Sequence, residues 1–263
     1  RAVKFALLVS NIGTYADPNA IVELARAAEE AGWDAVLVWD HLGFVWTSAA
    51  ADPWVTLGAV AASTERILLG TGVTPVARRR PHVLANEIAT LERVSGGRVI
   101  FGAGLGGGRG EFARFGEDEA ERARAERLDE GLDVIRALLG GEVVQHRGPH
   151  FTVDGVQLQP PPTRRVPIWI GGMSKRARAR AARFDGWFAD TADKDTILKT
   201  PEEFAALLAG YDFGDVAFMG YSDAGDRELH ESYADAGATW WIEQIHDGRG
   251  DAAAMLARVR RGP

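Results

Sequence analysis

Cysteine is absent from this sequence of 263 residues. Its absence excludes disulfide bonds, thiolate-bound metals, iron–sulfur clusters and a cysteine nucleophile. A chain without cysteine suits a reducing compartment, so we expect a cytoplasmic protein.

Long apolar runs and excess positive charge are also lacking. No stretch approaches the roughly 20 apolar residues that span a bilayer, and the N-terminal segment lacks a signal-peptide pattern. The 30 basic residues are outnumbered by 37 acidic ones, which gives a formal net charge of −7. We therefore expect neither a nucleic-acid nor a membrane partner, but a small organic molecule.

Two groups of catalytic motifs are missing. The six histidines form neither H-E-x-x-H nor H-x-H, and no G-x-S-x-G is present. The sequence therefore predicts no metal site and does not support a serine hydrolase of the nucleophile-elbow type.

What the chain does contain is a repeated strand and helix pattern. Short apolar runs alternate with segments whose apolar residues recur at helical spacing, such as the helix that begins at Asp17-Pro18 and ends at Gly32. The first four strands begin about 32 residues apart. Eight strands are predicted, over residues 3–9, 35–39, 66–70, 98–102, 167–170, 186–189, 215–219 and 238–242.

Eight such units over residues 1–263 predict a single α/β domain with the (β/α)8 TIM-barrel fold. The long interval before the fifth strand predicts an insertion at about 140–165, part of which has the pattern of a hairpin. Functional groups of such barrels lie where the strands end, so the residues that follow each strand are the candidates for chemistry.

Asp40 and His41 follow the second strand. A polar pair at a strand end is often only a polar terminus, but histidine can exchange a proton near neutral pH. We favour the functional interpretation, although the pair by itself names no reaction.

Gly171, Gly172, Met173 and Ser174 lead from the fifth strand into a helix. Glycines allow close approach to the backbone, and N–H groups at a helix start bind anions, so the segment is a candidate phosphate site. The alternative is a plain turn with Ser174 as the helix cap. A G-x-G-x-x-G match at 102–107 is discounted, because it follows the fourth strand and does not lead promptly into a helix.

Taken together, several segments resemble the superfamily of luciferase-like monooxygenases, which are flavin- and deazaflavin-dependent oxidoreductases. The resemblance covers nearly the whole chain and is carried by residues 39–41, 69–75, 89–98, 101–104 and 167–172. It implies an eight-stranded barrel with an insertion after strand four and a flavin ring at the barrel mouth.

The resemblance also implies roles for individual residues. Asp40 and His41 would lie beside the ring, with His41 exchanging a proton and Asp40 orienting or polarising it. The Gly72–Val73 bond is the candidate for a non-proline cis peptide that supports one ring face, next to Thr71. The segment 171–174 would hold the cofactor phosphate.

The Asp-His pair and the Thr-Gly-Val-Thr run resemble members that use coenzyme F420, so we favour hydride transfer between F420 and a small organic substrate. Leu105 stands where some of these enzymes have a glutamate, so a glutamate-assisted proton transfer cannot be carried over. Two alternatives stay open. One is an FMN-dependent monooxygenase that uses molecular oxygen and a flavin reductase partner, and the other is a non-catalytic flavin-binding barrel.

Three further features of the sequence have two interpretations each. Phe44 and Trp46, in an apolar loop, form either a substrate lid or a contact with a second subunit, because the family often forms homodimers. Arg78 to Arg80 either attract the acidic tail of F420 or are solvated surface. The run Trp240, Trp241 and Glu243 could face the barrel interior or the outer helices.

Overall fold

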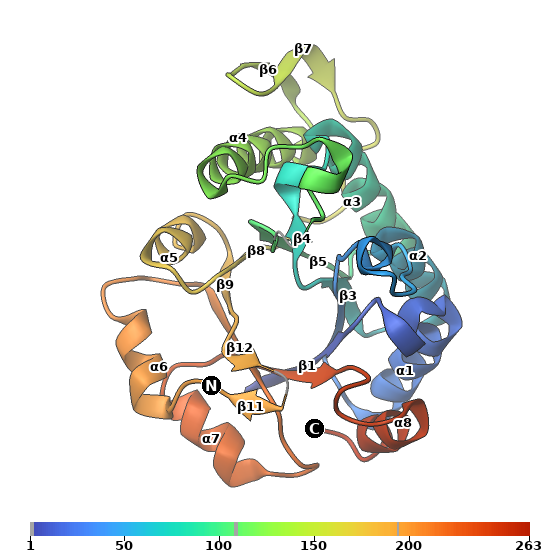
Figure 1. Cartoon of the computed structure of the whole chain (residues 1–263). Helices are drawn as coiled ribbons and strands as arrows, with labels where there is room; N and C mark the ends of the chain where they lie inside the picture. The colour runs from blue at the N-terminus through green and yellow to red at the C-terminus, as the bar shows by residue number, and fades with distance from the viewer. Residues whose placement is uncertain (1–2, 108–109, 194) are drawn as a thin grey trace.

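Eight parallel strands close into a barrel in the computed structural model, which describes residues 3–107, 110–193 and 195–263 (Figure 1). They are β1 (Lys4–Val9), β2 (Ala35–Val38), β3 (Leu68–Thr71), β5 (Val99–Gly104), β8 (Ile168–Gly171), β9 (Gly186–Ala189), β12 (Asp215–Gly220) and β13 (Trp240–Ile245). Each pairs with the next in this order, and β13 pairs with β1. The predicted TIM barrel and its eight strands are confirmed.

Helices surround the barrel (Figure 1). The eight α-helices of the described residues are α1 (Pro18–Ala31), α2 (Pro53–Ser63), α3 (Pro81–Ser95), α4 (Glu121–Leu139), α5 (Lys175–Ala181), α6 (Pro201–Leu208), α7 (Arg227–Asp235) and α8 (Ala252–Arg260). The start of α1 follows from its sequence, since Asp17 accepts a hydrogen bond from the Asn19 N–H and Pro18 takes the first position. None of the described helices is both long and apolar enough to cross a membrane.

The strands divide the core into two layers, because successive side chains point to opposite faces of a sheet. Leu8, Trp169 and Trp240 belong to a cluster formed by side chains from alternating strand positions, whereas Trp241 belongs to the larger cluster shared with the helices. The open question about the Trp240-Trp241 pair is thus resolved, with the two rings in different layers. Glu243 is fully buried and accepts hydrogen bonds from Ser222 and Trp241.

An antiparallel hairpin lies outside the ring, beyond α4 (Figure 1). It consists of β6 (Val143–Arg147) and β7 (Thr152–Gln157), within the segment predicted as an insertion. Glu130 of α4 fastens it by accepting hydrogen bonds from the backbone N–H groups of His150 and Phe151 and by pairing with His146 Nε2 at 2.9 Å. This anchoring fixes the hairpin to α4, outside the barrel.

Arg98, just before β5, connects several elements at the amino-terminal end of the barrel. Its side chain is buried and donates to the carbonyl oxygens of Ala61, Thr64, Ile67 and Ser95, as well as to the Thr64 hydroxyl. Burial lowers the pKa of Arg98, although the charge of Glu29 opposes this. One side chain thus satisfies carbonyl groups at the ends of α2 and α3 that the helices leave without partners.

Candidate active site

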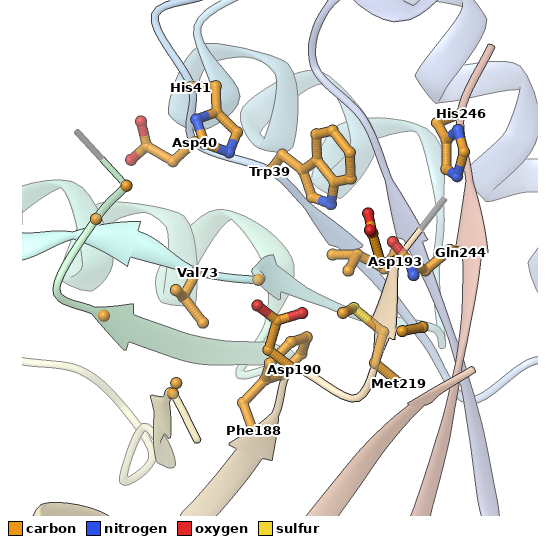
Figure 2. Close-up of a pocket in the computed structure, with 18 of the residues that line it drawn as sticks. Trp39, Asp40, His41, Val73, Phe188, Asp190, Asp193, Met219, Gln244 and His246 are labelled. Atoms are coloured by element: carbon orange, nitrogen blue, oxygen red, sulfur yellow. The ribbon is translucent and has the colours of Figure 1, made fainter. Parts of the chain in front are cut away.

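A cavity of about 1070 Å³ opens at the carboxyl ends of the barrel strands. Figure 2 shows Trp39, His41 and His246 along one side of it and Val73, Phe188 and Asp190 along the other. Its lining combines apolar side chains, glycines and polar groups: Leu8, Trp39, Asp40, His41, Gly72, Val73, Pro75, Gly104, Leu105, Gly106, Gly107, Gly171, Gly172, Phe188, Asp190, Ala192, Asp193, Asp195, Leu198, Met219, Tyr221, Gln244, His246 and Gly248.

Val73 forms part of the apolar wall. The Gly72–Val73 peptide bond is cis, as the resemblance predicted. Glycine at 104 makes room for Val73, because a Cβ there would overlap Val73 Cγ2. Thr71, the predicted neighbour of this bond, is fully buried and donates to the Gly102 carbonyl at 2.9 Å, so its hydroxyl serves the barrel rather than the cavity.

His41 is held from behind by Glu111. Its ring Nδ1 lies 3.2 Å from each carboxylate oxygen, and the side chain of His41 is 35% exposed while that of Glu111 is fully buried. A carboxylate can only accept, so Nδ1 carries a proton and donates it, which leaves Nε2 as the ring nitrogen that Glu111 does not engage. Nε2 has no hydrogen-bond partner in the described part of the chain, and His41 lines the cavity.

Glu111 also binds the backbone N–H of Leu42 and forms an ion pair with Arg78 at 3.2 Å. Burial opposes its ionisation, but the hydrogen bond and charge of His41, the Leu42 N–H and Arg78 outweigh burial and lower the pKa of Glu111. Sequence reasoning missed Glu111 because it considered only the position of Leu105. The carboxylate comes six residues later, in the same loop after β5.

Replacing Glu111 by glutamine is expected to lower the free energy of unfolding by about 2 kcal/mol near pH 7. Because folding lowers the pKa of Glu111, its stabilisation is complete above the ordinary carboxyl pKa of 4.5 and is lost as the pH falls through the folded value. Urea unfolding of both proteins at several pH values should show the difference shrinking in acid. Exposed Glu126, replaced by glutamine, is the control, and a difference that stays constant with pH contradicts the assignment.

Asp40, which was expected to orient or polarise the proton-exchanging group, lines the cavity but contacts two arginines rather than His41. Its carboxylate binds Arg78 at 2.9 Å and Arg79 at 2.8 and 3.0 Å, and Figure 2 shows it pointing away from the centre of the cavity. Two buried or half-buried guanidinium groups thus neutralise Asp40, and Glu111 rather than Asp40 orients His41. The same contacts hold Arg78 and Arg79 in place, so these two side chains are neither solvated surface nor free to attract an acidic tail.

The predicted phosphate segment contributes partly to the cavity. Gly171 and Gly172 line it, and Gly172 has a φ of +121°, a conformation that favours glycine. Ser174 caps α5 by accepting a hydrogen bond from the Ala177 N–H at 3.1 Å. Met173 and Ser174 are not among the lining residues of the cavity, so a role in phosphate binding stays a prediction.

Phe44 and Trp46 lie in a short 3₁₀ helix, η2 (Gly43–Trp46). The ring of Trp46 packs 5.6 Å from that of His41, whereas Phe44 is 55% exposed and contacts the ring of Phe115 at 6.2 Å. Neither is among the residues that line the cavity, and both interpretations of this loop remain predictions.

The polar groups beyond β8 were not found by sequence reasoning, which searched only the ends of the first five strands. Tyr221 follows β12, Gln244 is the next-to-last residue of β13 and His246 follows β13, and all three line the cavity. Asp190, after β9, also lines it, and burial together with the charge of Asp193 raises the pKa of Asp190. Searching all eight strand ends would have found them.

The cavity suits a planar flavin or deazaflavin ring. Such a ring needs an apolar surface for its face, close backbone approach and polar groups for its heteroatom edge. Val73 and Phe188 supply the first, and a Cβ on Gly171 would come within 3.1 Å of both Val73 methyl groups, so glycine keeps this wall open. No group of three or more candidate metal ligands occurs in residues 3–107, 110–193 and 195–263.

A comparison with protein families agrees with this geometry. The family model described as luciferase-like monooxygenase matches residues 5–259. The chain belongs to this family. The predicted resemblance to this family is therefore confirmed.

Among curated relatives, an F420-dependent glucose-6-phosphate dehydrogenase of Microbacterium testaceum is 35% identical over 199 residues, which cover 73% of this chain and 58% of the relative. An F420-dependent hydroxymycolic acid dehydrogenase of Mycobacterium tuberculosis is 35% identical over 198 residues, which cover 73% of this chain and 55% of the relative. The matched residues of this chain thus span less than three fifths of the length of each of these relatives.

Two solved structures share the fold. An F420-dependent secondary alcohol dehydrogenase, in complex with an F420–acetone adduct, has a TM-score of 0.82 at 20% identity and covers 100% of this chain and 98% of its own. The F420-dependent tetrahydromethanopterin reductase of Methanopyrus kandleri has a TM-score of 0.78 at 18% identity, covering 100% and 99%. At identities of 18–20%, this structural similarity establishes the barrel fold alone.

Proposed function

We propose that this protein is an oxidoreductase that binds coenzyme F420 in the cavity and transfers a hydride between it and a small organic substrate. The observation that carries the proposal is the placement of His41, which lines the cavity and whose Nδ1 donates to the buried carboxylate of Glu111. Two relatives at 35% identity are F420-dependent dehydrogenases, which supports the choice of coenzyme.

When bound, the deazaflavin ring supplies a carbon that accepts or releases a hydride. His41 would take up the O–H proton of the substrate at Nε2 when an alcohol is oxidised, and it would return that proton to the substrate oxygen when a carbonyl is reduced. Glu111 would keep the imidazole ring of His41 in place during this exchange. Asp40 would act indirectly. It binds Arg78, and Arg78 contacts Glu111.

Other residues near the cavity would bind the coenzyme phosphate and the substrate. Gly171, Gly172, Met173 and Ser174 would hold the coenzyme phosphate through backbone N–H groups. Trp46, beside His41, would contact the substrate, with exposed Phe44 next to it. A homodimer and a cytoplasmic location, both expected from the sequence, also belong to the proposal.

Parallel titrations of the purified protein with F420 and FMN, followed by quenching of its eight tryptophans, test the coenzyme. Tight F420 binding, followed by oxidation of reduced F420 on addition of carbonyl compounds, is the expected result. Preferential FMN binding with oxygen consumption and a flavin reductase would instead assign an FMN monooxygenase. Tight F420 binding without turnover of any acceptor would assign a non-catalytic binding protein.

A further inference from the structure

A second polar site faces the same cavity at the ends of β12 and β13. The Tyr221 hydroxyl lies 3.1 Å from His246 Nε2 and accepts a hydrogen bond from Gln244 Nε2 at 2.9 Å. The ring of Trp39 connects this site to His41, because it stacks on His246 at 6.1 Å and meets His41 edge-on at 5.7 Å. An aromatic wall therefore runs from the proposed proton-exchange group to Tyr221.

The direction of these hydrogen bonds follows from His246. Its Nδ1 accepts a hydrogen bond from the backbone N–H of Gly248 at 3.1 Å, so Nδ1 carries no proton when the ring is neutral. The proton is therefore on Nε2, and this nitrogen cannot accept one from Tyr221. Gln244 also presents its N–H to the tyrosine, so both neighbours of the hydroxyl oxygen are donors.

We propose that Tyr221 is a substrate-binding residue that donates its O–H to an uncharged oxygen, a carbonyl or hydroxyl, of the substrate. His246 and Gln244 both donate to the hydroxyl oxygen, so neither can accept the O–H proton. Because Tyr221 lines the cavity, this proton is available to a bound substrate. The inference rests on the proposed function, since it concerns the substrate of the same site.

The surroundings keep the hydroxyl protonated. Burial raises the pKa of Tyr221 to about 12, and Asp193, Asp195 and Glu243 add to the effect while Arg249 opposes it. The guanidinium of Arg249 lies 5.1 Å from the centre of the tyrosine ring and so fixes the ring. A protonated tyrosine can donate to an uncharged oxygen. The nearby carboxylates would repel a phosphate or carboxylate group of a substrate.

Cyclohexanone labelled with ¹³C at the carbonyl is the probe, because it is neutral and offers one acceptor. Its affinity is measured by tryptophan quenching and its carbonyl stretch by infrared difference spectroscopy, with and without oxidised F420. Tyr221→Phe removes the hydroxyl alone, and Gln244→Glu replaces a donor by a carboxylate that would accept the hydrogen bond of the tyrosine O–H. Tyr211→Phe is the matched control, since the hydroxyl of Tyr211 donates to the Lys175 carbonyl and Tyr211 does not line the cavity.

We expect Tyr221→Phe and Gln244→Glu each to weaken cyclohexanone binding about tenfold and to move the bound carbonyl band to higher wavenumber. Tyr211→Phe should resemble the unchanged protein. Equal affinity and an unshifted band in Tyr221→Phe, or no binding of cyclohexanone by the unchanged protein, overturn the inference. F420 titration of the same samples separates this outcome from failure of the proposed function, which would appear as absent coenzyme binding.

Discussion

Replacing His41 by alanine is expected to lower turnover with F420 about a thousandfold while coenzyme affinity changes by less than about threefold. The variant removes the proposed proton-exchange group, but it leaves Val73, Phe188 and the glycine-lined wall that would hold the ring. Steady-state oxidation of reduced F420 by a carbonyl substrate measures the first quantity, and fluorescence titration measures the second.

His146 provides a matched control, because it also pairs with a glutamate, Glu130, but on the outer hairpin. His146→Ala should leave turnover unchanged. If His41→Ala retained full turnover, His41 would have no part in the mechanism. A large loss of coenzyme affinity with unchanged turnover at saturation would make it a binding group only.

The largest effect on stability is expected for Arg98→Ala, which should lower the free energy of unfolding by about 4 kcal/mol. The substitution leaves buried carbonyl groups of Ala61, Thr64, Ile67 and Ser95 without their donor. Urea unfolding monitored by circular dichroism measures the change. The control is Arg122→Ala, because Arg122 is 90% exposed and its pairing with Glu126 lies on the helix surface.

If Arg98→Ala unfolded at the same urea concentration as the unchanged protein, solvent would have to replace the guanidinium at these carbonyls. The structure argues against this replacement, because the side chain is buried between α2, α3 and the start of β5. Lysine at this position should recover only a small part of the loss, since one ammonium group cannot reach carbonyls that the planar guanidinium contacts on several sides.

The barrel could be predicted from the sequence because its signals are local. Apolar runs with a regular spacing of strand starts, together with caps such as Asp17-Pro18, indicate each strand and helix without knowledge of the partners. The strand boundaries moved by a few residues, as for β13, which starts at Trp240 rather than 238. Hydrogen bonding to neighbouring strands sets those ends.

The site was predictable only in part, because its partners meet through the fold. His41 could be found at a strand end, but Glu111 lies 70 positions further along the chain and contacts it only once the barrel closes. Arg78 and Arg79 carry the same ambiguity, since a run of arginines looks alike whether it is solvated or bound to Asp40. No local pattern distinguishes these cases.

The position of Glu111 has a consequence for redesign. This residue belongs to the long connection between β5 and α4, in which Leu105, Gly106 and Gly107 line the cavity. A protein engineer who shortens or extends that connection to admit bulkier compounds would also shift the carboxylate behind His41. The range of accepted substrates and the proposed proton exchange are therefore linked through this connection, and libraries that vary it should leave Glu111 unchanged.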